Sequence, residues 1–468
     1  MIETDYLVVG AGASGMAFVD SLIAESDGDV VMVDRRQRPG GHWNDAYPFV
    51  RLHQPSAYYG VNSRVLGNDA IDEVGPNAGF YERATADEIC DYYNRVLDEQ
   101  LLGSGQVRFF GMCDYVGNRS GEHRFVSRLT GEETDVRVRR KFVDATYLEA
   151  AVPATHPPPF GVDADVRLIP VGELTKLTSS GTGYTIIGGG KTSMDACQWL
   201  LDNRVPPEAI RWIRPRETWL LNRAFQQSLG LLPGLLEGVS LTREAAAHAE
   251  HIPDLFDRLE ASEQLIRLDT SVVPTMYRCA TVSWDEVKSL RRIDNVVRRG
   301  HVTHIGANRM TMDEGSIPTD PGQVHVDCTA AGLGIPPVRP IFNSHRITLQ
   351  LVRSCQPCFS AALVGFVEAS QDDDEEMNRL CPTNQYPSTA TDWIPTHLIS
   401  QLAQSAWSKA PDVKAWVKDS RLNLARGIRE HRDDPQMESA LTRLSEKTGP
   451  AIVNLQRFLD QAGAKVAA

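Results

Sequence analysis

The sequence predicts an α/β protein in which one parallel-sheet domain is inserted into another and a helical part follows at the C-terminal end. Three observations lead to this prediction. An apolar strand enters a glycine-rich turn and then a helix at residue 10, the same order recurs at residue 188, and a proline-rich segment spans 153–159. Strands that alternate with helices are typical of parallel sheets, and a proline-rich segment is typical of a connection between domains.

The composition is that of a globular protein of several domains. The chain has 468 residues, of which 42% are hydrophobic and 23% charged, and its net charge is −13. Nucleic-acid binding requires clustered cations, which this acidic chain lacks. No apolar run approaches the roughly 20 residues that span a bilayer, and eight scattered cysteines favour reduced thiols. We expect a soluble, cytoplasmic protein without nucleic-acid, membrane or metal partners. The sequence does not decide whether the protein forms a homo-oligomer.

The first glycine-rich turn has the order of a dinucleotide-binding unit. The apolar run 6–9 leads into G-A-G-A-S-G over residues 10–15, helix-spaced apolar residues follow, and a second strand, 30–33, ends at Asp34. The first glycine of such a turn allows tight reversal, the second lets backbone approach a pyrophosphate, and the third allows close packing of helix on strand. The helix N-terminus attracts phosphate. Asp34 is predicted to accept the ribose hydroxyls.

The second turn has the same order but a different sequence. The run 184–187 leads into G-G-G-K-T-S over residues 188–193. A P-loop is excluded because Thr185 stands where that motif requires glycine. The segment instead fits a second dinucleotide loop with a serine in the third glycine position. After the strand 210–213 there is no acid, and Arg214 and Arg216 favour a 2′-phosphate, hence NADPH; a solvated basic loop is the alternative.

The two turns define the expected domains. Residues 1–180 and 331–468 would form the first dinucleotide-binding domain, and residues 181–330 the inserted NADPH-binding domain, with a helical insertion around 229–300. The strand-like segment 324–329 would return the chain to the first domain.

Further motifs suggest a family. Gly-Gly-His-Trp at 40–43 follows the first unit, and Val-Asp-Cys-Thr-Ala-Ala-Gly stands at 326–332. With the two loops, these motifs resemble those of class B flavin-dependent monooxygenases, the group of flavin-containing and Baeyer–Villiger monooxygenases. The similarity covers about residues 1–220 and 320–335. The family's linker motif, Phe-x-Gly-x-x-x-His, is missing at 168–174, where neither the phenylalanine nor the histidine is present.

This resemblance implies that the chain binds FAD and NADPH and uses molecular oxygen, through a C4a-(hydro)peroxyflavin, to oxygenate a small amine, thioether or carbonyl compound. It implies FAD contacts by Gly10, Gly12, Ala13, Ser14, Gly15, Asp34, Arg35, Gly41, His42, Trp43, Asn62, Ser63 and Cys113. It implies NADPH contacts by Gly188, Gly190, Lys191, Thr192, Ser193, Arg214 and Arg216. Asn62 would be the catalytic residue beside the flavin, or else an ordinary turn residue.

Two other functions stay open. A flavin-dependent disulfide reductase would need a redox cysteine pair, and Cys355 and Cys358 have the C-x-x-C spacing of such pairs. A non-catalytic flavoprotein or dinucleotide sensor would explain the missing linker motif.

Overall fold

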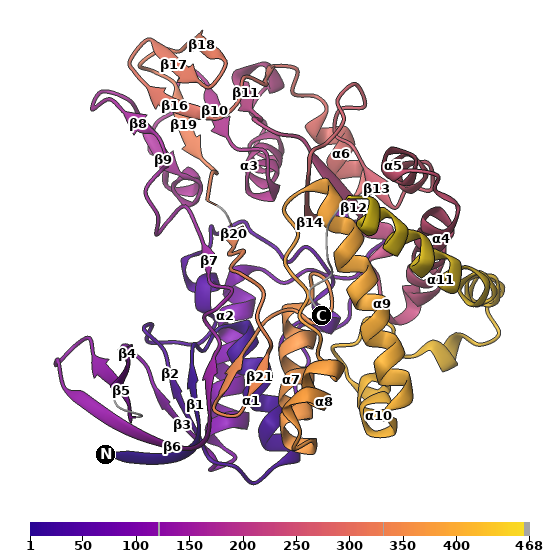
Figure 1. The fold of residues 1–468 in the computed structure, drawn as a ribbon. Coiled ribbons are helices and arrows are strands. Elements are labelled where there is room, and N and C mark those ends of the chain that lie inside the picture. Colours follow the sequence, from indigo (N-terminus) through magenta and orange to yellow (C-terminus); the bar gives the residue numbers. More distant parts are fainter. Residues whose placement is uncertain (120–121, 331, 463–468) are drawn as a thin grey trace.

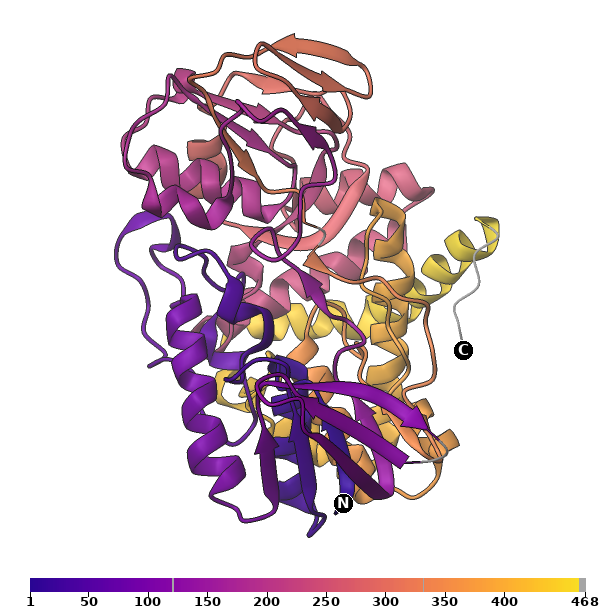
Figure 2. The same ribbon diagram turned by 90° about the vertical axis from the view of Figure 1, so that its left-hand side faces the viewer.

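The computed structural model describes residues 1–119, 122–330 and 332–462; Ala331, part of the 326–332 motif and the start of one expected domain segment, lies outside them. Figures 1 and 2 show a first sheet at the bottom of the molecule and a second unit, made from the middle of the chain, at the top. The predicted α/β class with two parallel-sheet units is confirmed.

The first unit is built on an eight-stranded sheet with a parallel centre. β1 pairs in parallel with β2 and β6, and β3 and β22 extend the parallel part on either side. β4, β5 and β21 add antiparallel pairs. The strands are β1 (Ile2–Val9), β2 (Val30–Val33), β3 (Val107–Phe110), β4 (Cys113–Arg119), β5 (Glu122–Ser127), β6 (Glu133–Asp144), β21 (Phe342–Asn343) and β22 (Arg346–Thr348).

Helices from both ends of the chain cover one face of this sheet. α1 (Ala13–Glu25) and α7 (Pro357–Ser370) share its main hydrophobic core. They cross closely, because a Cβ atom on Gly365 would lie 2.4 Å from the Phe18 carbonyl oxygen. The same core takes side chains from α2 (Ala86–Arg95), α8 (Asp374–Leu380) and α10 (Pro411–Asp419).

The second unit is a five-stranded sheet in which all neighbours are parallel, in the order β15-β11-β10-β19-β9. Helices α3 (Lys191–Asp202) and α6 (Trp284–Leu290) pack on one face, and a four-stranded sheet covers the other. The strands are β9 (Leu168–Pro170), β10 (Tyr184–Ile187), β11 (Ile210–Ile213), β15 (Val296–Val297) and β19 (Val324–Asp327), with β8 (Gly161–Val162), β16 (Val302–Ile305), β17 (Arg309–Met312) and β18 (Gly315–Pro318) in the covering sheet.

The segment predicted as a helical insertion contains helices and strands. α4 (Leu232–His248) and α5 (Ile252–Ala261) are helical as expected, but β13 (Leu265–Ile266) and β14 (Met276–Val282) pair with β12 (Thr218–Asn222) in a small sheet. These strands are short and depend on partners distant in sequence. α9 (Trp393–Lys409) and α11 (Pro435–Gln461) pack on this layer, so the C-terminal helices also cover the insertion (Figure 1).

The connections between the units lie side by side. β7 (Ala150–Ala151) leaves the first unit and pairs in an antiparallel manner with β20 (Gly332–Leu333), which returns to it (Figure 1). Since β8 and β9 join the sheets of the second unit, that unit begins near residue 161, and the expected boundary at 181 falls inside it. Within the described ranges, no helix is long and apolar enough to cross a membrane.

Candidate cofactor and substrate cavity

The first glycine-rich turn has the geometry of a phosphate-binding loop. Gly10 has a φ of +106°, which favours glycine. A Cβ atom on Gly15 would lie 2.0 Å from the Gly10 carbonyl oxygen, so the close approach of helix and strand excludes any side chain there. α1 starts at Ala13, and its N-cap residue Gly12 has no side chain to occupy the first N–H groups. Those groups can therefore bind an anion.

Asp34 follows β2 directly and lies beside this loop. Its buried carboxylate accepts hydrogen bonds from the backbone N–H groups of Ala11 and Arg36, each at 2.7 Å. These bonds fix both oxygens at the cavity wall, where further lone pairs stay available for hydroxyl groups. Arg35 follows and forms an ion pair with Glu149 on the same wall.

The segment 40–43 packs directly on the first loop. The Gly40 N–H donates to the Ala11 carbonyl at 2.9 Å, and a Cβ atom on Gly12 would lie 3.6 Å from the Gly41 Cα. Trp43 donates through Nε1 to the Tyr59 hydroxyl at 2.7 Å. Burial, assisted by the charge of Arg36, lowers the pKa of the neighbouring His42 to about 4, so this side chain is neutral at pH 7.

The second turn repeats the geometry at the end of β10. Gly188 has a φ of +142°, and a Cβ atom there would lie 2.7 Å from the Cys328 carbonyl oxygen. A Cβ atom on Gly190 would meet no atom within 4 Å, so the backbone at the start of α3 faces open space. Approach by a pyrophosphate therefore meets no obstacle at that position.

Both loops open on one cavity of about 1020 Å³, at the upper end of the range for ligand-binding cavities in proteins. It brings together most of the residues expected from the sequence: Gly10, Gly12, Ala13, Ser14, Asp34, Arg35, Gly41, His42, Trp43, Cys113, Gly188, Gly190, Lys191, Thr192 and Arg216. Five expected residues lie outside its lining, namely Gly15, Asn62, Ser63, Ser193 and Arg214.

The two arginines after β11 lie in different environments. Arg216 is exposed and lines the cavity. Arg214 is buried, forms an ion pair with Glu217, and places its guanidinium 4.8 Å from the centre of the Trp212 ring. Of the two, only Arg216 is positioned to meet a cofactor in the cavity.

Asn62, where a contact with the flavin was one expectation, lies outside the cavity lining and hydrogen-bonds to other parts of the chain. Its side-chain oxygen accepts hydrogen bonds from the Ser420 hydroxyl and the Arg421 N–H, each at 3.0 Å. Its own N–H and that of Ser63 donate to the buried carboxylate of Asp20 at 2.9 and 3.0 Å. These contacts favour the turn alternative, since they attach the C-terminal segment to the first unit.

Lys191 lines the cavity and also belongs to a buried polar cluster. Its ammonium forms ion pairs with Asp195, one turn further along α3, and with Glu286 of α6 at 3.7 Å. Tyr47 donates to the Asp195 carboxylate at 2.7 Å. Sequence reasoning missed Asp195 and Glu286 because no spacing connects α3 with α6.

The cysteines differ from the expectation of reduced thiols, and the alternative C-x-x-C pair of Cys355 and Cys358 is not formed. Cys355 is bonded to Cys279 of β14, 76 residues away, and both line the cavity. Cys358 is a buried free thiol near the Tyr93 hydroxyl, and burial raises its pKa to about 11. The spacing could not identify this pair because the partner comes from the inserted unit.

Comparisons with known proteins agree with this architecture. A family model described as an NAD(P)-binding Rossmann-like domain matches residues 8–62. The chain is 46% identical to the uncharacterized proteins Rv2000 of Mycobacterium tuberculosis and Mb2023 of Mycobacterium bovis, over 99% of this chain and 86% of theirs. The polycyclic ketone monooxygenase of Thermothelomyces thermophila superimposes with a TM-score of 0.50 and 12% identity, covering 95% of this chain and 89% of that one.

An identity of 46% over nearly the full length shows that this chain and the mycobacterial proteins belong to one family. The structural match shows that the resemblance stated from the motifs holds for the fold. The chain belongs to the family of these mycobacterial proteins, and its fold is the flavin-monooxygenase-like one with two dinucleotide-binding domains.

Proposed function

We propose that the protein is a flavin-dependent monooxygenase that binds FAD at the first loop and NADPH at the second, and oxygenates a small organic molecule between them. The observation that carries this proposal is that both dinucleotide loops, 10–15 and 188–193, open on the same cavity. Hydride transfer needs two cofactors in contact, and a shared cavity is the arrangement that allows it.

The first site fits FAD. Uncapped N–H groups at the start of α1 suit the pyrophosphate, and the fixed carboxylate of Asp34 suits the ribose. Cys113 lines the cavity where the adenine is expected, and its N–H donates to the Asp34 carbonyl oxygen at 3.0 Å. The neutral His42 and the fixed Trp43 form a wall for the ring system.

The second site fits NADPH. Gly190 leaves open space at the start of α3, and the strand end carries no acid that would select a free 2′-hydroxyl. We assign the 2′-phosphate to Arg216, which is exposed at the cavity. Arg214 instead supports the strand end through Glu217.

When bound, the flavin supplies hydride acceptance and the reaction with oxygen. The chain binds and orients the two cofactors and limits the access of water to the site. Tyr59 and Trp43 form one hydrogen-bonded part of the wall, and the neutral His42 holds no proton that it could release at pH 7. A soft nucleophile, such as an amine or a thioether, or a carbonyl compound is the substrate class of this chemistry.

The test uses the full chain loaded with FAD. Amines, thioethers and ketones are supplied with NADPH under ¹⁸O₂, and we expect one class to accelerate NADPH consumption and yield a product heavier by one labelled oxygen atom. NADPH consumption that matches hydrogen peroxide release, without labelled product from any class, would refute oxygenation. A purified protein unable to take up FAD would refute the whole proposal.

A second candidate function is supported by one observation: the Cys279–Cys355 disulfide lines the cavity that receives both cofactors. A dithiol reductase would pass two electrons from NADPH through the flavin to this bond, with two protons, and give two thiols. Anaerobic NADPH titration followed by thiol labelling and mass spectrometry distinguishes the candidates. Two newly labelled cysteines, 279 and 355, would favour the reductase, and an unlabelled pair would favour the monooxygenase.

A further inference from the structure

We propose that the cavity takes a substrate with a carboxylate, which binds at the wall formed by Lys191 and Arg51. Lys191 also belongs to a buried cluster with excess positive charge. The inference depends on the proposed function, because it names the substrate class of the same cavity.

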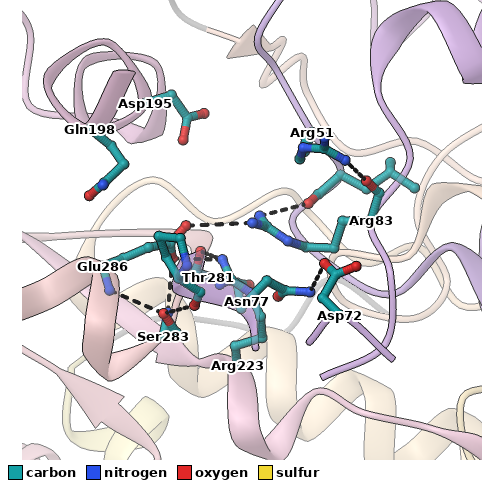
Figure 3. Close-up of polar contacts among 12 residues, drawn as sticks. Arg51, Asp72, Asn77, Arg83, Asp195, Gln198, Arg223, Thr281, Ser283 and Glu286 are labelled. Carbon is teal, nitrogen blue, oxygen red and sulfur yellow. Dashed lines mark hydrogen bonds and ion pairs between the residues drawn. The ribbon is translucent and has the colours of Figure 1, made fainter. Parts of the chain in front are cut away.

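The cluster is centred on Glu286 of α6 (Figure 3). One carboxylate oxygen accepts a hydrogen bond from Arg223 Nη2 at 2.7 Å. The other lies 3.7 Å from Arg83 Nη2 and 3.7 Å from Lys191 Nζ. Three segments distant in sequence therefore direct cations at one acid: the loop before α2, the start of α3 and the turn after β12.

The charges of this cluster do not balance. Three cations, Arg83, Arg223 and Lys191, face two anions, Glu286 and Asp195, so one positive charge is in excess. The exposed fractions of the side chains are 0% for Arg223, 7% for Glu286 and 8% for Lys191. Water therefore provides little compensation, and an uncompensated buried charge is costly.

The arginines also have donors in excess. Arg223 Nε and Nη1 and Arg83 Nε are buried and have no acceptor among the described residues. Arg223 Nη2 additionally donates to the Thr281 carbonyl oxygen at 3.2 Å. The two anions of the cluster therefore do not accept hydrogen bonds from all the N–H groups of its arginines.

The positive charge is accessible from the cavity. Lys191, His53 and Thr281 line it. The exposed Arg51 lines it as well and donates to the carbonyl oxygen of Arg83, a cation of the cluster, at 2.9 Å. Burial, together with the charge of Lys191, lowers the pKa of His53 to about 4, so His53 stays neutral. A carboxylate entering the cavity here would supply the missing negative charge.

The phosphates of NADPH are the other source of negative charge, and the geometry favours the substrate. The ammonium of Lys191 pairs with Asp195 and Glu286, and the same side chain lines the cavity beside this cluster. The open space for a pyrophosphate lies at the backbone of Gly190. We therefore assign Lys191 to the substrate and leave the phosphates to the loop backbone and Arg216.

The test measures binding to the FAD-loaded full chain by calorimetry at constant ionic strength. The probes are thioether acids and their primary amides, matched in size, beginning with 4-(methylthio)phenylacetate and its amide. We expect each acid that binds to be at least tenfold tighter than its amide. Lys191→Met should weaken the acids roughly tenfold to a hundredfold, which is the range for a charged hydrogen bond, and leave the amides unchanged.

Two variants keep the test decisive. Lys288→Met, which removes an exposed lysine of α6, is the matched control and should change neither probe. Lys191→Met leaves two cations against two anions in the buried cluster, so we expect this variant to fold. Arg51→Gln lies outside the buried cluster and is an independent test, which should also weaken the binding of the acids.

If the wild-type protein binds none of the acids more tightly than the matching amide, the proposal is overturned. A weaker NADP⁺ affinity in Lys191→Met with intact acid preference would also overturn it, by giving Lys191 to the cofactor. Acid-selective binding without NADPH-driven oxygen consumption would support this proposal and refute the oxygenation.

Discussion

Replacement of Glu286 by glutamine tests the charge balance of the buried cluster most directly. The change keeps the size of the side chain and removes the negative charge that three cations share. After it, Arg83, Arg223 and Lys191 face Asp195 as the remaining anion of the cluster. We expect lower stability of the second unit at neutral pH.

The magnitude follows from the pKa of Glu286. Burial by itself raises this pKa, but Lys191, Arg223 and Arg83 outweigh burial and lower it from 4.5 to about 2. A difference of about 2.5 units at 1.36 kcal/mol per unit corresponds to roughly 3 kcal/mol of folding free energy at pH 7. This value agrees with the roughly 3–5 kcal/mol measured when one partner of a buried ion pair is removed.

The direction of the pKa shift of Glu286 determines how the folding free energy changes with pH. A carboxyl whose pKa is lowered in the folded state stabilises the fold above about pH 4.5, and this stabilisation is lost as the pH falls toward 2. The glutamine variant lacks this stabilisation at every pH. The free energies of wild type and variant should therefore differ by roughly 3 kcal/mol at pH 7 and converge below pH 4.5.

The assay is urea-dependent hydrogen exchange, read by mass spectrometry on peptides that cover α6, because a chain of several domains need not unfold in one step. Asp285→Asn is the control, since Asp285 is an exposed neighbour that pairs with Lys288. Equal exchange of wild type and Glu286→Gln at pH 7, or a difference that persists unchanged to pH 3, would refute the reasoning.

Three further predictions concern the cofactor loops and the C-terminal segment. Gly15→Ala should abolish FAD retention, read from flavin absorbance, because the new Cβ would lie 2.0 Å from the Gly10 carbonyl oxygen. Arg216→Gln should raise the KM for NADPH roughly tenfold and leave that for NADH unchanged, whereas Arg214→Gln should lower thermal stability and affect both alike. Arg421→Met should lower the urea midpoint, because this guanidinium donates to three backbone carbonyls, those of residues 57, 59 and 61.

Each of these predictions has its own control. Gly449→Ala, in α11, should keep the flavin, since a Cβ atom there would meet no atom within 4 Å. Equal effects of Arg216→Gln on both nucleotides would contradict the 2′-phosphate assignment. Arg421→Lys should lose less stability than Arg421→Met because it keeps a charged donor, and equal losses would contradict the role of the hydrogen bonds.

The two nucleotide loops were predictable because each is contiguous in sequence. The strand, turn and helix around residues 10–15 carry their own conformational requirements, namely the positive φ of Gly10 and the close approach at Gly15. Asp34 follows the next strand directly, and parallel pairing of β1 with β2 brings it to the same edge. Such patterns need no information from distant parts of the chain.

The orientation of single side chains was not predictable. Arg214 and Arg216 follow the same strand, and only the packing of Arg214 between Trp212 and Glu217 leaves Arg216 at the cavity. Asn62 is attached to Ser420, 358 residues away, so a local motif could not decide between a flavin contact and a turn.

The sequence by itself determined the α/β class, the two dinucleotide loops and the insertion of one unit into another, because these depend on local order and glycine geometry. Only the tertiary structure decided which side chains meet at the cavity. The buried cluster around Glu286, the start of the second unit near residue 161 and the Cys279–Cys355 bond join segments that no spacing connects. Their proximity results from packing of the two units and the insertion, and it is this packing that concentrates positive charge beside the cavity.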